Sequence, residues 1–183
     1  MLPLTLFSPY VQLLLKWNQK INLIGKSTER EIYQRHIADS LRLLQHLHPE
    51  ETICDIGSGA GLPGIVLSIA GVKHVTLVES DKRKCAFLQV ASGLSPNLIR
   101  LIDQRVEGLQ LECDRIVCRA FASVSNILAL TVGLRARNGY LLLKGQHLER
   151  ELQEARQQWQ FKCRVYEGNI AEITDVQKDN SGS

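Results

Sequence analysis

A glycine-rich segment, Asp55-Ile-Gly-Ser-Gly-Ala-Gly-Leu-Pro-Gly64, constrains the fold of this chain more than any other. It follows a short β-branched run at 52–56 and precedes a helical run that begins near Pro63 and ends near Gly71. Proline suits the first turn of a helix, and glycine adopts positive φ and lets another group approach the backbone closely. A strand, a glycine turn and a helix in this order predict the first turn of an open parallel sheet, where ligands bind.

The rest of the chain alternates between strand and helix patterns. Tyr10, Leu14, Trp17 and Ile21 mark one face of an N-terminal helix, and a capping-box pattern at Thr28 starts a second helical stripe that Pro49 ends. Strands are predicted at 52–56, 74–78, 97–102, 115–118, 140–143, 161–166 and 170–176, and helices at 63–71, 82–94, 127–134 and 148–159. The predicted fold class is α/β, a Rossmann-like, doubly wound sheet of about seven mostly parallel strands, ending in an antiparallel hairpin.

Length and composition favour one soluble domain. The 183 residues predict a single domain at 1–183, with residues 1–48 as a helical extension and 177–183 as a flexible tail. The net charge of +3 neither requires nor excludes a nucleic-acid partner. The chain has five cysteines without a Cys-x-x-Cys pair, which predicts free thiols in a reducing cytoplasm and no metal site. We also expect no membrane-spanning helix. The protein is expected to be a monomer.

Two ligands compete for the glycine segment. A dinucleotide needs Gly-x-Gly-x-x-Gly, but Leu62 stands where the third glycine would be, because Gly61 comes one residue early. S-adenosylmethionine carries an ammonium group, which suits the carboxylate of Asp55. Glu79 ends the second predicted strand and can accept hydrogen bonds from the ribose hydroxyls of either ligand. The spacing favours S-adenosylmethionine over a dinucleotide or an empty turn.

At this point the sequence resembles the RsmG (GidB) family of bacterial methyltransferases, which act on guanine N7 of small-subunit ribosomal RNA. The glycine segment is similar to the family's cofactor loop. Five further segments match in the same order: Leu15-Lys-Trp-Asn-Gln-Lys-Ile-Asn-Leu23, Arg35-His-Ile-Ala-Asp-Ser-Leu41, Arg105-Val-Glu107, Cys118-Arg-Ala-Phe-Ala122 and Leu142-Leu-Lys-Gly145. Together they span about residues 10–155.

The resemblance implies a class I methyltransferase that uses S-adenosylmethionine and acts on 16S ribosomal RNA or the 30S particle. The residues expected to bind the cofactor are Asp55, Gly57, Gly59, Gly61, Leu62, Glu79, Val106, Glu107 and Arg119. The family's final strand usually carries an Arg-His pair, which is absent from 170–176 here, so an RNA contact from that strand is not expected. A methyltransferase of a small molecule or a protein is the alternative.

Arg119 is the expected catalytic residue, because it ends an apolar strand at the sheet edge where ligands bind. Arg35, His36, Lys82 and Lys144 are the candidate RNA contacts. Each has a plainer alternative. Arg35 is spaced for an ion pair with an acid four residues later, and His36 borders an apolar stripe. The alternative for Lys82 is a place on a solvated helix face, and the alternative for Lys144 is a solvated lysine at a strand end.

Overall fold

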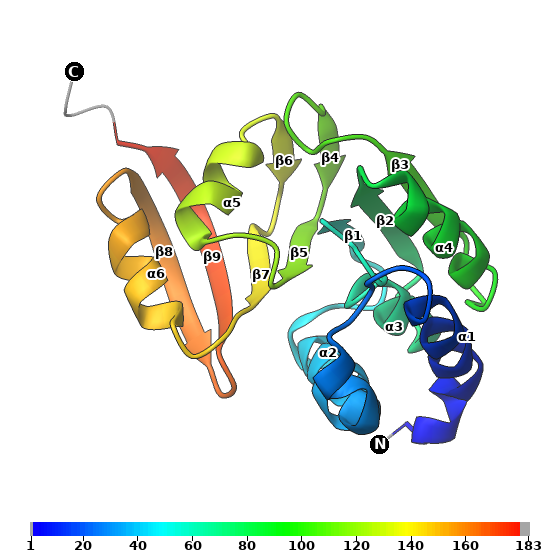
Figure 1. Cartoon of the computed structure of the whole chain (residues 1–183). Helices are drawn as coiled ribbons and strands as arrows, with labels where there is room; N and C mark the ends of the chain where they lie inside the picture. The colour runs from blue at the N-terminus through cyan, green and yellow to red at the C-terminus, as the bar shows by residue number, and fades with distance from the viewer. Residues whose placement is uncertain (1, 180–183) are drawn as a thin grey trace.

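The computed structural model describes residues 2–179, in which seven strands form one sheet (Figure 1). They are β1 (Thr52–Ile56), β2 (His74–Glu79), β3 (Ile99–Asp103), β5 (Arg115–Arg119), β7 (Tyr140–Leu143), β8 (Trp159–Tyr166) and β9 (Ile170–Lys178). Their spatial order is β3-β2-β1-β5-β7-β9-β8, and β9 runs antiparallel to both of its neighbours, β7 and β8. This confirms the predicted sheet and its C-terminal hairpin.

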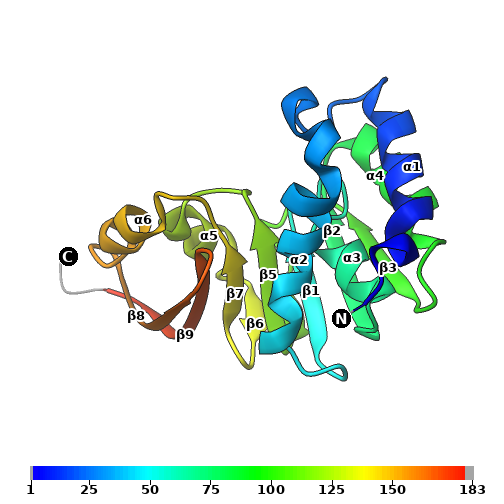
Figure 2. The same cartoon turned by 90° about the horizontal axis from the view of Figure 1, so that it is seen from below.

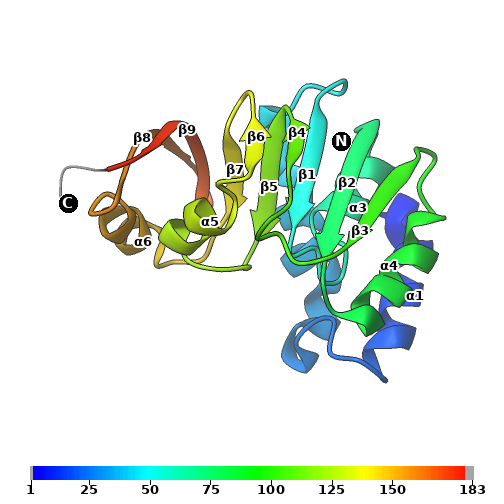
Figure 3. The ribbon, with the colours of Figure 1, turned by 90° about the horizontal axis from the view of Figure 1, so that it is seen from above.

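The central strands β1, β5 and β7 are buried on both faces because helices cover both sides. Successive residues of β1 enter different cores: Ile53 packs with the N-terminal helices, while Cys54 packs with the helices of the second half. Figure 2 shows α1 (Ser8–Asn18), α3 (Gly64–Ile69) and α4 (Lys82–Ser92) beside β1, β2 and β3. Figure 3 shows α5 (Val124–Leu130) and α6 (Leu148–Ala155) beside β7, β8 and β9. The carboxyl ends of the parallel strands therefore meet at one edge.

The second N-terminal helical stretch is less regular than its apolar stripe predicts. Its 3₁₀ segments are Lys26–Glu31 and Arg42–His46, on either side of a π-helical segment, Tyr33–Ala38, and the short α2 (Asp39–Leu41); another 3₁₀ turn, Leu4–Phe7, precedes α1. The predicted stripe packs against the core: Ile37 is fully buried, and Tyr33, Leu41, Leu44 and Leu47 are half-buried. The capping box is wrong, because the Thr28 hydroxyl donates to the Gly25 carbonyl oxygen at 2.8 Å.

Three further predictions are corrected. The helix expected at 127–134 ends at Leu130, because 134–136 form β6 (Leu134–Ala136), which pairs in parallel with β4 (Leu111–Cys113). The helix expected at 148–159 ends at Ala155, since Trp159 begins β8. Gln177 belongs to β9 and pairs with β8, so the flexible tail does not begin there; residues 180–183 lie outside the described residues.

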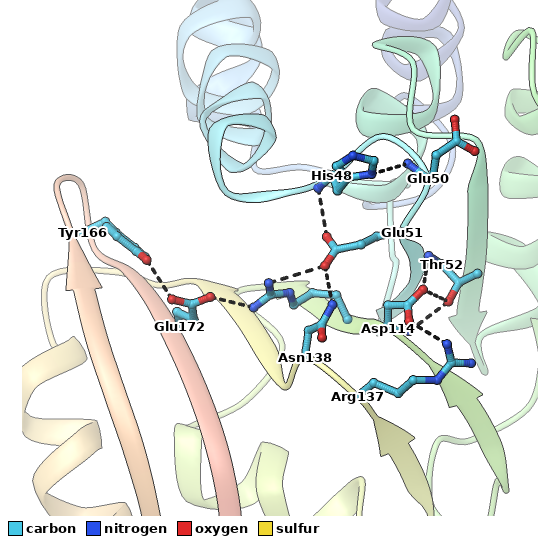
Figure 4. A network of polar contacts seen from close by, with 10 residues as sticks. His48, Glu50, Glu51, Thr52, Asp114, Arg137, Asn138, Tyr166 and Glu172 are labelled. Carbon is cyan, nitrogen blue, oxygen red and sulfur yellow. Dashed lines mark hydrogen bonds and ion pairs between the residues drawn. The ribbon is translucent and has the colours of Figure 1, made fainter.

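A buried arginine ties distant segments together at the first residue of β5, away from the carboxyl ends of the parallel strands. Arg115 lies 2.8 Å from the carboxylate of Glu172 on β9 and 3.6 Å from that of Glu51, just before β1. Tyr166 donates to the other oxygen of Glu172, and Asn138 donates to Glu51 (Figure 4). These contacts hold the C-terminal hairpin against the first strand, although the Nε of Arg115 has no hydrogen-bond partner among residues 2–179.

Candidate active site

A cavity of about 260 Å³ lies at the carboxyl ends of β1, β2 and β5. It is lined by Gly57, Val78, Glu79, Ser80, Gln104, Arg105, Val106, Glu107, Phe121, Ala122 and Leu130. The structure thus brings together four residues expected to bind the cofactor: Gly57, Glu79, Val106 and Glu107. We call this space the cofactor cavity. Within residues 2–179, no group of three or more His, Cys, Asp or Glu side chains is arranged to hold a metal ion.

Glu79 joins the glycine loop to the end of β2. Its Oε2 accepts from the Gly59 backbone N–H at 2.9 Å, and its Oε1 accepts from the backbone N–H groups of Ser80 and Asp81 at 2.8 and 2.9 Å. The side chain lines the cavity although the residue is only 8% exposed. Glu79 therefore fixes the loop, and its remaining lone pairs can accept from a ligand hydroxyl.

The three glycines have different reasons to be glycine. All have positive φ, but a Cβ on Gly57 would lie 2.0 Å from the Phe121 ring, and one on Gly61 would lie 2.5 Å from Ile65. Only Gly59 has open space, with its nearest neighbour atom at 3.7 Å. A ligand can therefore approach the backbone closely at Gly59. At Gly57 and Gly61, the space beside the glycine is already occupied by the side chains of Phe121 and Ile65. Leu62 is buried in the core and does not line the cavity.

Asp55 lies beneath the loop and does not line the cofactor cavity. It is fully buried, and its Oδ2 accepts from the Gly64 backbone N–H at 3.0 Å. Burial raises the pKa of the carboxyl to about 7. We expected Asp55 to contact an ammonium group directly. In the structure its Oδ2 instead holds the glycine loop through the Gly64 N–H, and its Oδ1 has no partner in the described part of the chain.

A second cavity, of about 430 Å³, lies on the other side of the segment 119–122. It is lined by Thr28, Arg35, His36, Asp39, Arg42, Arg119, Ala120, Leu143, Lys144, Gly145, Gly168 and Asn169. We call it the cationic cavity, since three arginines and one lysine line it against a single acid, Asp39. Ala120, which has a φ of +49°, faces this cavity, whereas Phe121 faces the cofactor cavity. One tight turn thus separates the two spaces.

A chain of hydrogen bonds fixes Arg119 in the cationic cavity. Its Nη1 donates to the Arg35 carbonyl oxygen at 2.8 Å, and its Nη2 lies 2.5 Å from Nδ1 of His36. A guanidinium can only donate, so His36 accepts at Nδ1 and carries its proton on Nε2. That nitrogen lies 2.8 Å from the Thr28 hydroxyl, which in turn donates to Gly25. The order of donors therefore determines the tautomer of the imidazole.

His36 is a neutral group in this chain of hydrogen bonds. Burial, the Arg119 charge and the Arg35 charge together lower the pKa of His36 to about 4. Burial also lowers the pKa of Arg119. The expectation that His36 contacts RNA is thus modified: the ring lines the cavity, but its Nδ1 and Nε2 are engaged within the protein. What it contributes is an orientation for Arg119.

Both lysines expected to contact RNA are paired within the protein. Lys144 is buried, with its Nζ 2.8 Å from Glu151 and a further hydrogen bond to the Ala122 carbonyl oxygen. Lys82 lies outside the cationic cavity, and its Nζ is 2.6 Å from Asp103. Sequence spacing did not indicate either acid. Lys144 therefore holds the segment 119–122, and Lys82 closes a surface ion pair.

Comparison with known proteins adds the family. A family model described as GidB, rRNA small subunit methyltransferase G, matches residues 4–177. The chain belongs to this family. "Ribosomal RNA small subunit methyltransferase G" of Rickettsia bellii is 43% identical over 96% of this chain and 93% of its own length, and that of Rickettsia prowazekii is 44% identical over 92% of each.

Solved structures similar to this GidB-family chain support the fold. A magnesium protoporphyrin IX methyltransferase from Synechocystis PCC 6803 with bound SAM has a TM-score of 0.56 at 13% identity, over 90% of this chain and 94% of that one. A ribosomal protein L11 methylase from Lactobacillus delbrueckii has a TM-score of 0.58 at 14% identity, over 78% of this chain and 77% of that one. Both comparisons place the chain among class I methyltransferase folds, and the family uses S-adenosylmethionine.

Sequence reasoning missed two residues of this GidB-family site. Tyr10 on α1 is fully buried, and its hydroxyl donates to the Ala60 carbonyl oxygen in the glycine loop at 2.6 Å. Phe121 covers Gly57 and lines the cofactor cavity. The helical period assigns Tyr10 to the core without naming a partner 50 residues away, and Phe121 was noted only as part of a motif.

None of the helices within residues 2–179 is long and apolar enough to cross a membrane.

Proposed function

We propose that the chain transfers a methyl group from S-adenosylmethionine to N7 of a guanine in 16S ribosomal RNA. The observation that carries the proposal is the pair of cavities that meet at the segment 119–122. One holds the residues suited to the cofactor, and the other presents basic side chains suited to an RNA backbone. The family and the names of its relatives support ribosomal RNA as the substrate.

The proposed methyl transfer needs no residue that removes a proton. S-adenosylmethionine supplies an electrophilic methyl group on a sulfonium. Guanine N7 has an available lone pair and no proton to lose, so no general base is needed. The protein contributes by holding guanine N7 in line with the methyl group of the donor. Such orientation speeds a reaction strongly, because well-oriented groups react as if at very high concentration. Gly57, Glu79, Val106 and Glu107 are proposed to bind the donor from the cofactor cavity, with Asp55, Gly59, Gly61 and Leu62 shaping the loop.

Arg119 is proposed as the catalytic residue. Its two contacts to Arg35 and His36 leave further guanidinium N–H groups free to donate toward a phosphate or the cofactor. Arg35 is proposed as a direct RNA contact, because it is basic and lines the same cavity. We propose that the protein acts as a monomer in the cytoplasm, where ribosomes assemble.

The test uses a labelled methyl donor with small-subunit particles or their RNA. Label recovered as 7-methylguanine is the expected result. Label that appears only in a protein or a metabolite would refute the proposal. Arg119→Ala should lower turnover by about 100-fold, as the loss of one group that stabilises the transition state does. Arg150→Ala, which removes an exposed arginine paired with Glu154, is the control and should turn over normally.

A further inference from the structure

A third cavity, of about 300 Å³, lies between the turn after α1 and the start of α4. It is lined by Lys20, Ile21, Asn22, Asp81, Arg83 and Lys84. Three of these side chains are cations and one is an acid, so the cavity has an excess of positive charge. We call it the basic cleft. No aromatic side chain lines it, so it lacks the aromatic surface on which single-strand binders usually stack bases.

The ion pairs distinguish the three cations of the run 82–84. The Lys82 ammonium is directed to Asp103, and the residue does not line the basic cleft. Arg83 lies 3.3 Å from Asp81. Within residues 2–179, neither Lys20 nor Lys84 forms an ion pair. Two ammonium groups from different elements, one from each wall, therefore share the cleft without a compensating carboxylate of their own.

The acid in the cleft is already engaged. Asp81 caps α4, accepting from the backbone N–H groups of Arg83 and Lys84 at 2.8 and 3.3 Å. Its hydrogen bonds to those N–H groups and to the Arg83 side chain lower the pKa of the carboxyl. Asp81 therefore serves the helix start and Arg83. The Asn22 amide adds a neutral group that donates hydrogen bonds.

The cleft borders the cofactor cavity. Glu79 and Ser80 line the cofactor cavity, and Asp81, the next residue, lines the basic cleft. An RNA strand with its target base at the cofactor can thus pass a neighbouring phosphate over the cleft. We propose that the basic cleft binds a backbone phosphate of the substrate RNA through Lys20 and Lys84. This inference rests on the proposed function and adds a contact that positions RNA independently of its base sequence.

The test compares Lys20→Gln/Lys84→Gln with the wild type and with a control, Lys178→Gln, an exposed lysine at the end of β9. Affinity for small-subunit RNA is measured at several salt concentrations. Each lost phosphate contact should lower the slope of log K against log salt by about 0.7–0.9. Because the two lysines share one phosphate, we expect the double variant to lose about 0.7–0.9 in slope and about 10-fold in affinity. Its Kd for S-adenosylmethionine by calorimetry and the control variant should be unchanged.

The outcomes separate the two proposals. If the wild type methylates RNA and the double variant keeps its RNA affinity and salt slope, the basic cleft does not bind RNA and the proposed function stands. If the double variant loses affinity for inorganic polyphosphate while its KM for RNA is unchanged, the cleft is a general anion site and the inference is also wrong. If the wild type neither binds nor methylates RNA, the proposed function fails and the inference fails with it.

Discussion

The neutral His36 makes the stability of the protein depend on pH in a way that one substitution removes. The pKa of His36 is about 4 in the folded chain and 6.5 in an ordinary peptide. Between these values the unfolded chain binds a proton that the folded chain does not. Protonation then favours unfolding, so the free energy of unfolding falls as the pH falls from 6.5 toward 4.

The size of the effect follows from the two pKa values. Near pH 5 the unfolded imidazole is almost fully protonated and the folded one is mostly neutral. The linkage relation gives a loss of about 2 kcal/mol relative to pH 7.5, where both states are neutral. His36→Asn keeps an amide oxygen that can accept from Arg119 but has no group that titrates here. We expect this variant to lose about 2 kcal/mol less than the wild type on acidification.

The assay is urea unfolding at about pH 7.5 and about pH 5. The informative quantity is the difference between the two pH values for each protein, because other titrating groups, including His46, are common to both. His147→Asn, which removes an exposed imidazole, is the control and should follow the wild type. Equal acid losses in the wild type and His36→Asn would refute both the neutral imidazole and the hydrogen-bond order deduced from it.

Three further outcomes are expected. Thr28→Val removes the acceptor of the His36 Nε2 proton and should lower methylation, while Thr28→Ser restores it; nitrogen NMR of the ring reports the tautomer directly. Gly57→Ala places a methyl group within 2.0 Å of the phenyl ring above it and should abolish S-adenosylmethionine binding in calorimetry. Lys144→Met leaves a carboxylate without its buried cation and should cost about 3 kcal/mol in urea unfolding, whereas Lys73→Met, in an exposed pair, should cost less than about 1 kcal/mol.

Much of the fold was predictable because its strands have clear boundaries. The strands at 52–56 and 140–143 have the predicted bounds, since each is an apolar run between polar or glycine residues. The short β4 and β6 were not predicted. Three-residue strands carry too little pattern, and the 127–134 run could be read as one helix. Gly133 contributes to this break, because a Cβ there would lie 2.4 Å from the Leu109 carbonyl oxygen.

The sequence predicted several of the residues that line the candidate site, but it did not predict which side chains they would contact. The residues Gly57, Glu79, Val106 and Glu107 meet at one cavity, because the ends of parallel strands share an edge. The partners of the cations depend on side chains that the sequence separates widely. His36 and Arg119 are 83 residues apart, and no local period relates them.

The contacts between the N-terminal helices and the sheet also set an order for biosynthesis. The ribosome synthesises α1 first. The Tyr10 hydroxyl can form its hydrogen bond only after Ala60 has been added, and His36 can accept from Arg119 only after Arg119 has been added. At the usual speed of a ribosome, of about 5–20 residues per second, that delay lasts several seconds. During that delay, the Tyr10 hydroxyl and the His36 ring lack the partners that they have in the fold. A chain that ends before Arg119 therefore has no group to fix the tautomer of His36.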